Sequence, residues 1–151
     1  MGSQKGSMKK RGAAKVARNF CFGCGQDNKQ GMRLKFSVDE KEKVARGRFR
    51  MAGRYRGSRA AVHGGIVATL VDEAMGKFNR LEGIVAPTAE LCVEYLRPVP
   101  LGRTIVVEAR PGEQHGRNYW RECPIRDSQG QLLVRGKGRF VKVGLRETPS
   151  S

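Results

Sequence analysis

Apolar residues recur at helical spacing along one stretch of the chain, from about Gly64 to Arg80. In a helix with 3.6 residues per turn they share one arc, while small and polar residues share the other. The pattern predicts one long amphipathic helix whose apolar arc faces the core and whose other arc carries Asp72. The apolar arc consists of Ile66, Val67, Leu70, Val71, Ala74, Met75 and Phe78, and the other of Gly65, Thr69, Asp72, Glu73 and Gly76.

Alternating apolar and polar residues predict β-strands on both sides of this helix. Before it, residues 33–38 and 44–51 are expected to pair as a hairpin. After it, turn signals separate four further strands, which we place at residues 88–96, 104–110, 118–126 and 131–143. A hairpin, one helix and a four-strand meander predict an α+β fold in which an antiparallel sheet wraps around one long central helix.

Two local features of these strands carry expectations of their own. Pro111 and Gly112 follow the strand at 104–110 and are expected to end it. In the last strand Arg135, Lys137 and Arg139 form a basic row, which is typical of a solvated face or a sheet edge.

The length of 151 residues fits one domain. We expect a flexible basic tail at residues 1–18, a folded domain at 19–145 and a flexible C-terminus at 146–151. A formal charge of +16 favours anionic ligands but does not identify one, and we expect no nucleic acid partner. No apolar stretch approaches the ~20 residues of a membrane span, and the N-terminus lacks the apolar core of a signal peptide. The sequence therefore predicts a cytoplasmic protein without membrane contact.

The pair Cys21 and Cys24 has the spacing of a metal or redox site. Structural zinc is usually held by four ligands, often two such pairs, and the other cysteines and histidines are not paired at ligand spacing. A redox dithiol belongs at the start of a helix after a strand, whereas Gly23 and Gly25 favour a loop. We therefore expect reduced thiols, no metal and no separate cofactor.

Candidate chemistry gathers at the start of the predicted helix, in His63-Gly64-Gly65. The first N–H groups of a helix have no internal partner and carry the positive end of its dipole, so they suit an oxyanion or a polarised carbonyl. Glycine leaves the backbone open to close approach by a ligand. Asp72 lies further along, among residues small enough to admit another surface.

These residues resemble those of a known family. His63-Gly64-Gly65, an apolar run and Asp72 nine positions after the histidine resemble the signature of hotdog-fold acyl-CoA thioesterases of the phenylacetate-degradation type. The segments 88–91 and 95–102 resemble that family's third strand and the turn after it, and the segment from Cys21 resembles the N-terminal signature of one large branch. The resemblance covers about residues 20–143 and implies a hotdog fold.

Carried over to this chain, the resemblance implies that the Gly64 N–H polarises the thioester carbonyl and that Asp72 is the catalytic carboxylate. Thr88 falls where related enzymes place a hydroxyl that helps to hold the water. One departure is at Gly57, where some relatives carry a polar side chain. His63 is expected either to take part in catalysis or to cap the helix.

The remaining site residues are expected to bind substrate. Gly65 permits close approach, and Glu73 either contacts the substrate or pairs with Lys77 one helical turn later. Three loop arginines are expected to meet the phosphates of coenzyme A; they are Arg54, Arg56 and Arg59.

The spacing of Gly64 and Asp72 predicts a dimer. Eight residues of straight helix separate them by roughly 12 Å, which is too far for both to serve one carbonyl carbon. Two antiparallel copies of the helix would bring the helix start of one chain near Asp72 of the other. We therefore expect a homodimer, assembled further into a dimer of dimers.

The expected activity is hydrolysis of a medium-chain or aromatic acyl-CoA to the free acid and coenzyme A. The alternative is a non-catalytic hotdog module that binds acyl-CoA as a signal or scaffold. Asp72 favours the enzyme, whereas Gly57 and the net charge leave room for the binding module.

Overall fold

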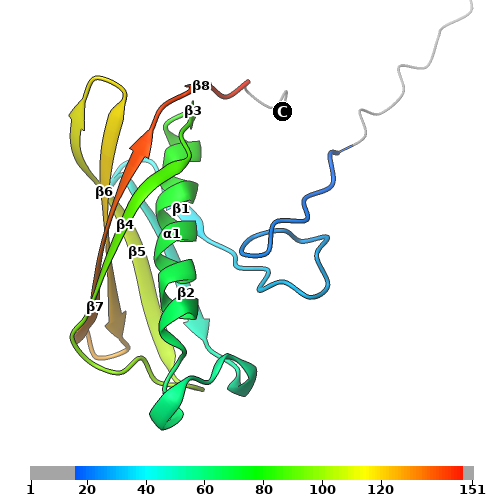
Figure 1. Cartoon of the computed structure of the whole chain (residues 1–151), viewed down its shortest axis with the longest axis vertical. Coiled ribbons are helices and arrows are strands. Elements are labelled where there is room, and N and C mark those ends of the chain that lie inside the picture. The colour runs from blue at the N-terminus through cyan, green and yellow to red at the C-terminus, as the bar shows by residue number, and fades with distance from the viewer. Residues whose placement is uncertain (1–15, 148–151) are drawn as a thin grey trace, which may run out of the picture.

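The computed structural model describes residues 16–147 as a six-stranded antiparallel sheet that packs along one long helix (Figure 1). The expected α+β hotdog layout is thereby confirmed. The predicted tails at 1–18 and 146–151 lie mostly outside the described residues. The elements are β1 (Ser37–Asp39), β2 (Val44–Arg50), 3-10 helices at Gly53–Tyr55 and Ser58–Ala60, α1 (Gly64–Leu81), β3 (Ile84–Val85), β4 (Thr88–Tyr95), β5 (Thr104–His115), β6 (Asn118–Asp127), β7 (Leu132–Val141) and β8 (Gly144–Leu145).

Helix α1 ends one residue later than predicted and buries the predicted arc against the sheet. Its buried side chains include Leu70, Met75 and Phe78, and Ile66 at the first turn is only partly buried. Gly136 of β7 lets the helix approach, because a Cβ there would lie 2.4 Å from Val71 Cγ1. No helix within residues 16–147 combines the length and apolar character needed to cross a bilayer.

The strand order is β1-β2-β5-β6-β7-β4, so the predicted four-strand meander is wrong. Of the four main strands after the helix, β5, β6 and β7 follow one another in space, whereas β4 pairs with β7 at the far edge, with Tyr95 opposite Val134. Alternation gives the face of each residue but not the neighbour of each strand. Because β7 lies inside the sheet, the edge interpretation of its basic row is also wrong, and Arg135 pairs instead with Glu94 at 3.1 Å.

Several strand boundaries also differ from the prediction. β1 begins only at Ser37, and Arg33 has a φ of 52°, which does not fit a strand. β5 continues through Pro111 and Gly112 to His115, because an irregularity in its pairing with β6 absorbs these residues. The predicted strand at 131–143 ends at Val141, and the short β8 that follows pairs with β3.

Two buried charged side chains tie the sheet together. Glu108 of β5 accepts hydrogen bonds from Arg46 Nε at 2.5 Å and from Arg110 Nε at 2.7 Å. Burial raises the pKa of Glu108, but these two guanidinium groups outweigh it, so the net pKa is lowered from the ordinary 4.5. Arg121 of β6 is 2% exposed and donates to Asn79 Oδ1 at 2.8 Å, which joins the sheet to the end of α1.

The connection from β2 to α1 is a loop of two short 3-10 helices. Arg59 and Ala60 both adopt positive φ, at 56° and 57°. The loop then folds back on itself through a hydrogen bond from Gly57 N to Ala61 O of 2.8 Å. It delivers His63 to the start of the helix, where the His63 N–H donates to Tyr55 O at 2.8 Å.

Candidate active site

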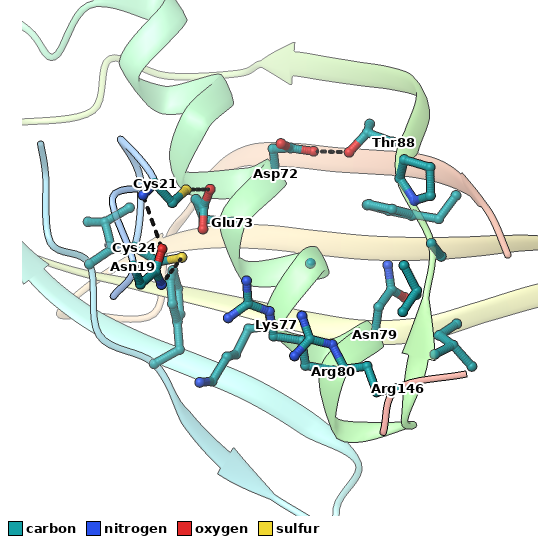
Figure 2. A pocket seen from close by; sticks show the side chains of 18 of the residues that line it. Asn19, Cys21, Cys24, Asp72, Glu73, Lys77, Asn79, Arg80, Thr88 and Arg146 are labelled. Carbon is teal, nitrogen blue, oxygen red and sulfur yellow. Dashed lines mark hydrogen bonds between the residues drawn. The ribbon is translucent and has the colours of Figure 1, made fainter. Parts of the chain in front are cut away.

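The structure brings the predicted carboxylate and hydroxyl together. Asp72 is half-buried on α1, and its Oδ1 accepts a hydrogen bond of 2.7 Å from Thr88 Oγ1 at the start of β4 (Figure 2). A hydroxyl that donates to a carboxylate fixes the rotamer of the carboxylate and leaves its second oxygen available. Asp72 therefore presents one oriented oxygen toward the space beside the helix.

At the N-terminal end of α1, His63 caps the helix. Its Nδ1 accepts the Gly65 N–H at 3.0 Å, and its backbone oxygen accepts the Ile66 and Val67 N–H groups at 2.9 and 3.0 Å. Within residues 16–147 no acceptor takes the Gly64 N–H, so of the first four helical donors only this one is open. Such a donor suits a developing negative charge.

Tyr95 and Gly57 shape the helix start further. The Tyr95 hydroxyl reaches across from the end of β4 and donates to Gly64 O at 2.6 Å, which holds the peptide in place. The sequence prediction missed Tyr95, which reads as an ordinary strand aromatic. Gly57 has no space for a side chain, because a Cβ there would lie 2.8 Å from His63 Cα. The position therefore offers no second side-chain contact to an oxyanion.

Asp72 and Gly64 open onto different hollows of the same chain. A cavity of about 780 Å³ is lined by Asp72 and Thr88 together with the N-terminal loop. A separate hollow of about 570 Å³ is lined by Gly64, His63 and Tyr95. The two groups thus point to two places, in agreement with their separation along the helix.

The predicted phosphate-binding arginines are only partly placed at these hollows. Arg59 lines the smaller one, whereas Arg54 and Arg56 line neither. Arg54 instead donates to the Tyr55 hydroxyl at 2.8 Å. The larger cavity carries basic residues that the prediction missed. Figure 2 shows Lys77, Arg80 and Arg146, and Lys35 also lines the cavity. Lys77 and Arg80 follow Asp72 within eight residues on the same helix, so the sequence alone could have placed them near the carboxylate.

Asn79 is a further cavity residue that the sequence pattern did not reveal. Its side chain is 2% exposed, and its Nδ2 has no hydrogen-bond partner among the described residues. Because Arg121 donates to its Oδ1, the amide orientation is set and the open group is a donor. Asn79 also lines the cavity of Asp72, so a polar ligand group there can satisfy it.

Glu73 does not pair with Lys77, so that expectation is wrong. Its Oε1 instead accepts from Cys21 Sγ at 3.5 Å, because the N-terminal loop folds against this face of α1. Burial first, and then the neighbouring Glu73 carboxylate, raise the pKa of the Cys24 thiol to about 11. Neither expected substrate contact, Glu73 nor Gly65, is tested by these distances, and both stay predictions.

Comparison with known proteins places this geometry in a family. A sequence profile described as the thioesterase superfamily matches residues 60–134, which span β4, α1 and the site residues from His63 to Thr88. The acyl-coenzyme A thioesterase THEM4 of Rattus norvegicus is 34% identical over 83 residues, which cover 54% of this chain and 36% of the rat protein. The match thus spans about a third of the length of this curated relative.

Solved structures show the same fold. A thioesterase superfamily protein with 29% identity superposes with a TM-score of 0.72, over 78% of this chain and 60% of that chain. A Streptococcus mutans protein bound to acetyl CoA has 17% identity and a TM-score of 0.70, over 76% of this chain and 91% of that chain. With a matching profile that runs from the start of α1 to the start of β7, the chain belongs to the thioesterase superfamily and has its hotdog fold.

Proposed function

We propose that the protein is an acyl-CoA thioesterase whose two active sites are shared between the subunits of a homodimer. One observation carries the proposal. The free Gly64 N–H and the Thr88-bound Asp72 carboxylate lie on one helix but open onto separate hollows. Each is half of a hydrolytic site, and the name of the rat relative supports acyl-CoA as the substrate.

In the proposed reaction, the Gly64 N–H stabilises the oxyanion that forms when the thioester carbonyl is attacked. Asp72 of the other subunit either takes a proton from the attacking water or attacks the carbonyl carbon itself. In the first case the carbon–sulfur bond breaks after water has added, and the free acid and the coenzyme A thiol are released. In the second case coenzyme A leaves as a mixed anhydride forms between the acyl group and Asp72, and a water molecule then hydrolyses the anhydride to the free acid and restores the carboxylate. Thr88 holds the carboxylate, and His63 holds the helix start rather than acting as base, since its Nδ1 is occupied.

The edge strand β4 supports the dimer. Within residues 16–147 its one partner strand is β7, and seven of its eight residues are exposed, including Leu91 at 36% and Tyr95 at 51%. An open strand edge with apolar side chains invites pairing with another strand. A second copy of β4 is a suitable partner, because two-fold pairing would place each Asp72 near the other chain's Gly64. Assembly into a dimer of dimers and a cytoplasmic location stay predictions.

The basic cavity residues support binding of coenzyme A. Lys77, Arg80 and Arg146 line the cavity that Asp72 opens onto, and phosphate groups pair strongly with such side chains. We assign them the phosphate contacts that the sequence pattern had given to Arg54 and Arg56, and retain Arg59 at the smaller hollow. For the acyl group we keep the medium-chain or aromatic class as part of the proposal.

A thiol-release assay over acyl-CoAs of increasing chain length and with aromatic acyl groups tests the function. We expect hydrolysis, and a loss of about 10²–10⁴-fold in kcat for Asp72→Asn, as is typical of acid–base residues. Glu40→Gln, in the exposed turn after β1, is the matched control and should keep full activity. Binding of coenzyme A without turnover of any substrate would instead establish the non-catalytic module.

A further inference from the structure

The N-terminal loop forms a tight turn that aims two thiols at helix α1. Between Cys21 and Cys24 the chain reverses, and the Gly25 N–H donates to Cys21 O at 2.8 Å. Only glycine fits at position 25, because a Cβ would lie 2.4 Å from Cys21 N. A Cys-x-x-Cys turn closed in this way holds both sulfurs on one side, as zinc-binding turns do.

Helix α1 supplies a third ligand atom that sequence spacing could not show. The Glu73 carboxylate lies against the turn, with Oε1 3.5 Å from Cys21 Sγ (Figure 2). One ligand atom from each of Cys21, Cys24 and Glu73 lies within 4.8 Å of the others. Gly23 makes this approach possible, because a Cβ there would lie 2.4 Å from Glu73 Cδ.

We propose that Cys21, Cys24 and Glu73 bind a zinc ion. Tetrahedral zinc, with Zn–S bonds of about 2.3 Å and Zn–O bonds of about 2.0–2.2 Å, separates its ligand atoms by roughly 3.5–3.8 Å. The distance of 3.5 Å from Cys21 Sγ to Glu73 Oε1 agrees with this spacing. Since all three ligand atoms lie within 4.8 Å of one another, small side-chain movements would bring them to the distances that zinc requires. Two sulfurs and one carboxylate oxygen suit zinc better than the harder calcium or magnesium ions.

Asn19 lies next to both cysteines and orients them. Its Nδ2 lies 4.0 Å from Cys24 Sγ in donor geometry, and its Oδ1 accepts the Cys21 N–H at 3.0 Å. A donor to sulfur stabilises the thiolate, and such outer contacts orient metal ligands. A disulfide between the two cysteines would remove the thiol that donates to the Glu73 carboxylate.

The fourth position of the ion would face the cavity, since both cysteines and Glu73 line it together with Asp72. Three protein ligands and one water is a common zinc arrangement. The ion would fasten the N-terminal loop to α1 one residue from Asp72, and the loop would then form a fixed wall of the cavity. This inference does not depend on the thioesterase proposal, because metal binding is measured without turnover.

Cobalt(II) is the probe for the test, since thiolate ligands give it a charge-transfer band in the near ultraviolet. The full chain is reduced with a phosphine, stripped with a chelator and titrated with cobalt(II), and zinc is then added in competition. We expect about one ion per chain, with the band displaced by zinc. Cys21→Ser and Glu73→Gln should each weaken zinc binding, and Asn19→Ala should weaken it by about 10–100-fold.

Cys92→Ser is the matched control, because Cys92 is an exposed cysteine on β4 outside the cluster, and it should bind zinc as the parent chain does. Circular dichroism confirms that each variant is folded. Absence of the band, or an unchanged band in both Cys21→Ser and Glu73→Gln, would overturn the proposal. So would a native chain that carries a Cys21–Cys24 disulfide by intact mass and binds no metal after reduction.

Discussion

Replacing Gly64 with proline removes the proposed oxyanion donor and little else. Gly64 is the first residue of α1, where proline is favoured because that N–H has no helical partner. The preceding His63 has φ −56° and ψ 135°, which is the conformation that a residue before proline prefers. The helix should therefore form normally in the Gly64→Pro protein.

The expected loss follows from the count of open donors. The Gly65, Ile66 and Val67 N–H groups are all taken by His63, so Gly64→Pro leaves no free N–H in the first turn of α1. Removing one oxyanion donor typically costs about 2.7–4 kcal/mol, or 10²–10³-fold in kcat. Gly64→Ala is the matched control, because its Cβ would meet Tyr95 Oη at an ordinary 3.5 Å and the N–H remains.

Co-expression of Gly64→Pro with Asp72→Asn then tests whether the site is shared. Random pairing yields half heterodimers, in which one site carries both lesions and the other carries neither, so about a quarter of all sites are intact. Purification with two different tags isolates the heterodimers, in which one of the two sites is intact, so a thiol-release assay should recover about half of the parent activity, although each homodimer is inactive. A mixture as inactive as its parents would refute the shared site, and full activity of Gly64→Pro would refute the oxyanion role.

Three further changes test other parts of the structure. Thr88→Val removes the donor to the catalytic carboxylate and should lower kcat by about 5–30-fold, equivalent to ~1–2 kcal/mol, with KM nearly unchanged in steady-state assays. Gly136→Ala should destabilise the fold by about 1–3 kcal/mol in urea unfolding through overpacking against α1, whereas Gly144→Ala, with open space around its Cβ, should not. The pKa of Glu108 is lowered from 4.5 on folding, so its contribution to the free energy of unfolding is present above pH 4.5 and is lost as the pH falls through the folded pKa. In urea unfolding at falling pH, the loss of stability should be smaller in Glu108→Gln than in the parent chain and unchanged in the exposed Glu122→Gln. An equal loss in the parent chain and both variants would assign the pH dependence to other groups.

The sequence predicted the parts of the site that lie on one element or in one motif. The periodicity of residues 64–80 gives α1 and its buried arc, and the position of Asp72 on the small and polar arc follows directly. The role of His63 as a cap follows from its place before two glycines. These are local relations, which the chain order contains.

The pattern of apolar and polar residues does not predict which distant segments come into contact. The pairing of β4 with β7 depends on the edge of the sheet at which the chain arrives after the helix. The alternation of apolar and polar residues along a strand does not determine that edge. Arg121 reads as a solvent-facing strand residue, yet Asn79 and two aromatic rings, Phe78 and Tyr119, surround its guanidinium in the core. Likewise, Glu73 lies 52 residues from Cys21, and only the folded loop brings them together.

The position of β4 also determines the order in which the chain can fold during synthesis. Tyr95 pairs with Val134 and Thr88 with Phe140, so β4 leaves the ribosome some 39 to 52 residues before its partner strand. At about 5–20 residues per second, β4 waits roughly 2–10 s without hydrogen-bond partners. The hairpins β5-β6 and β6-β7 join neighbours in the chain and close first, and the strand that we assign to the dimer seam is the last to join the sheet.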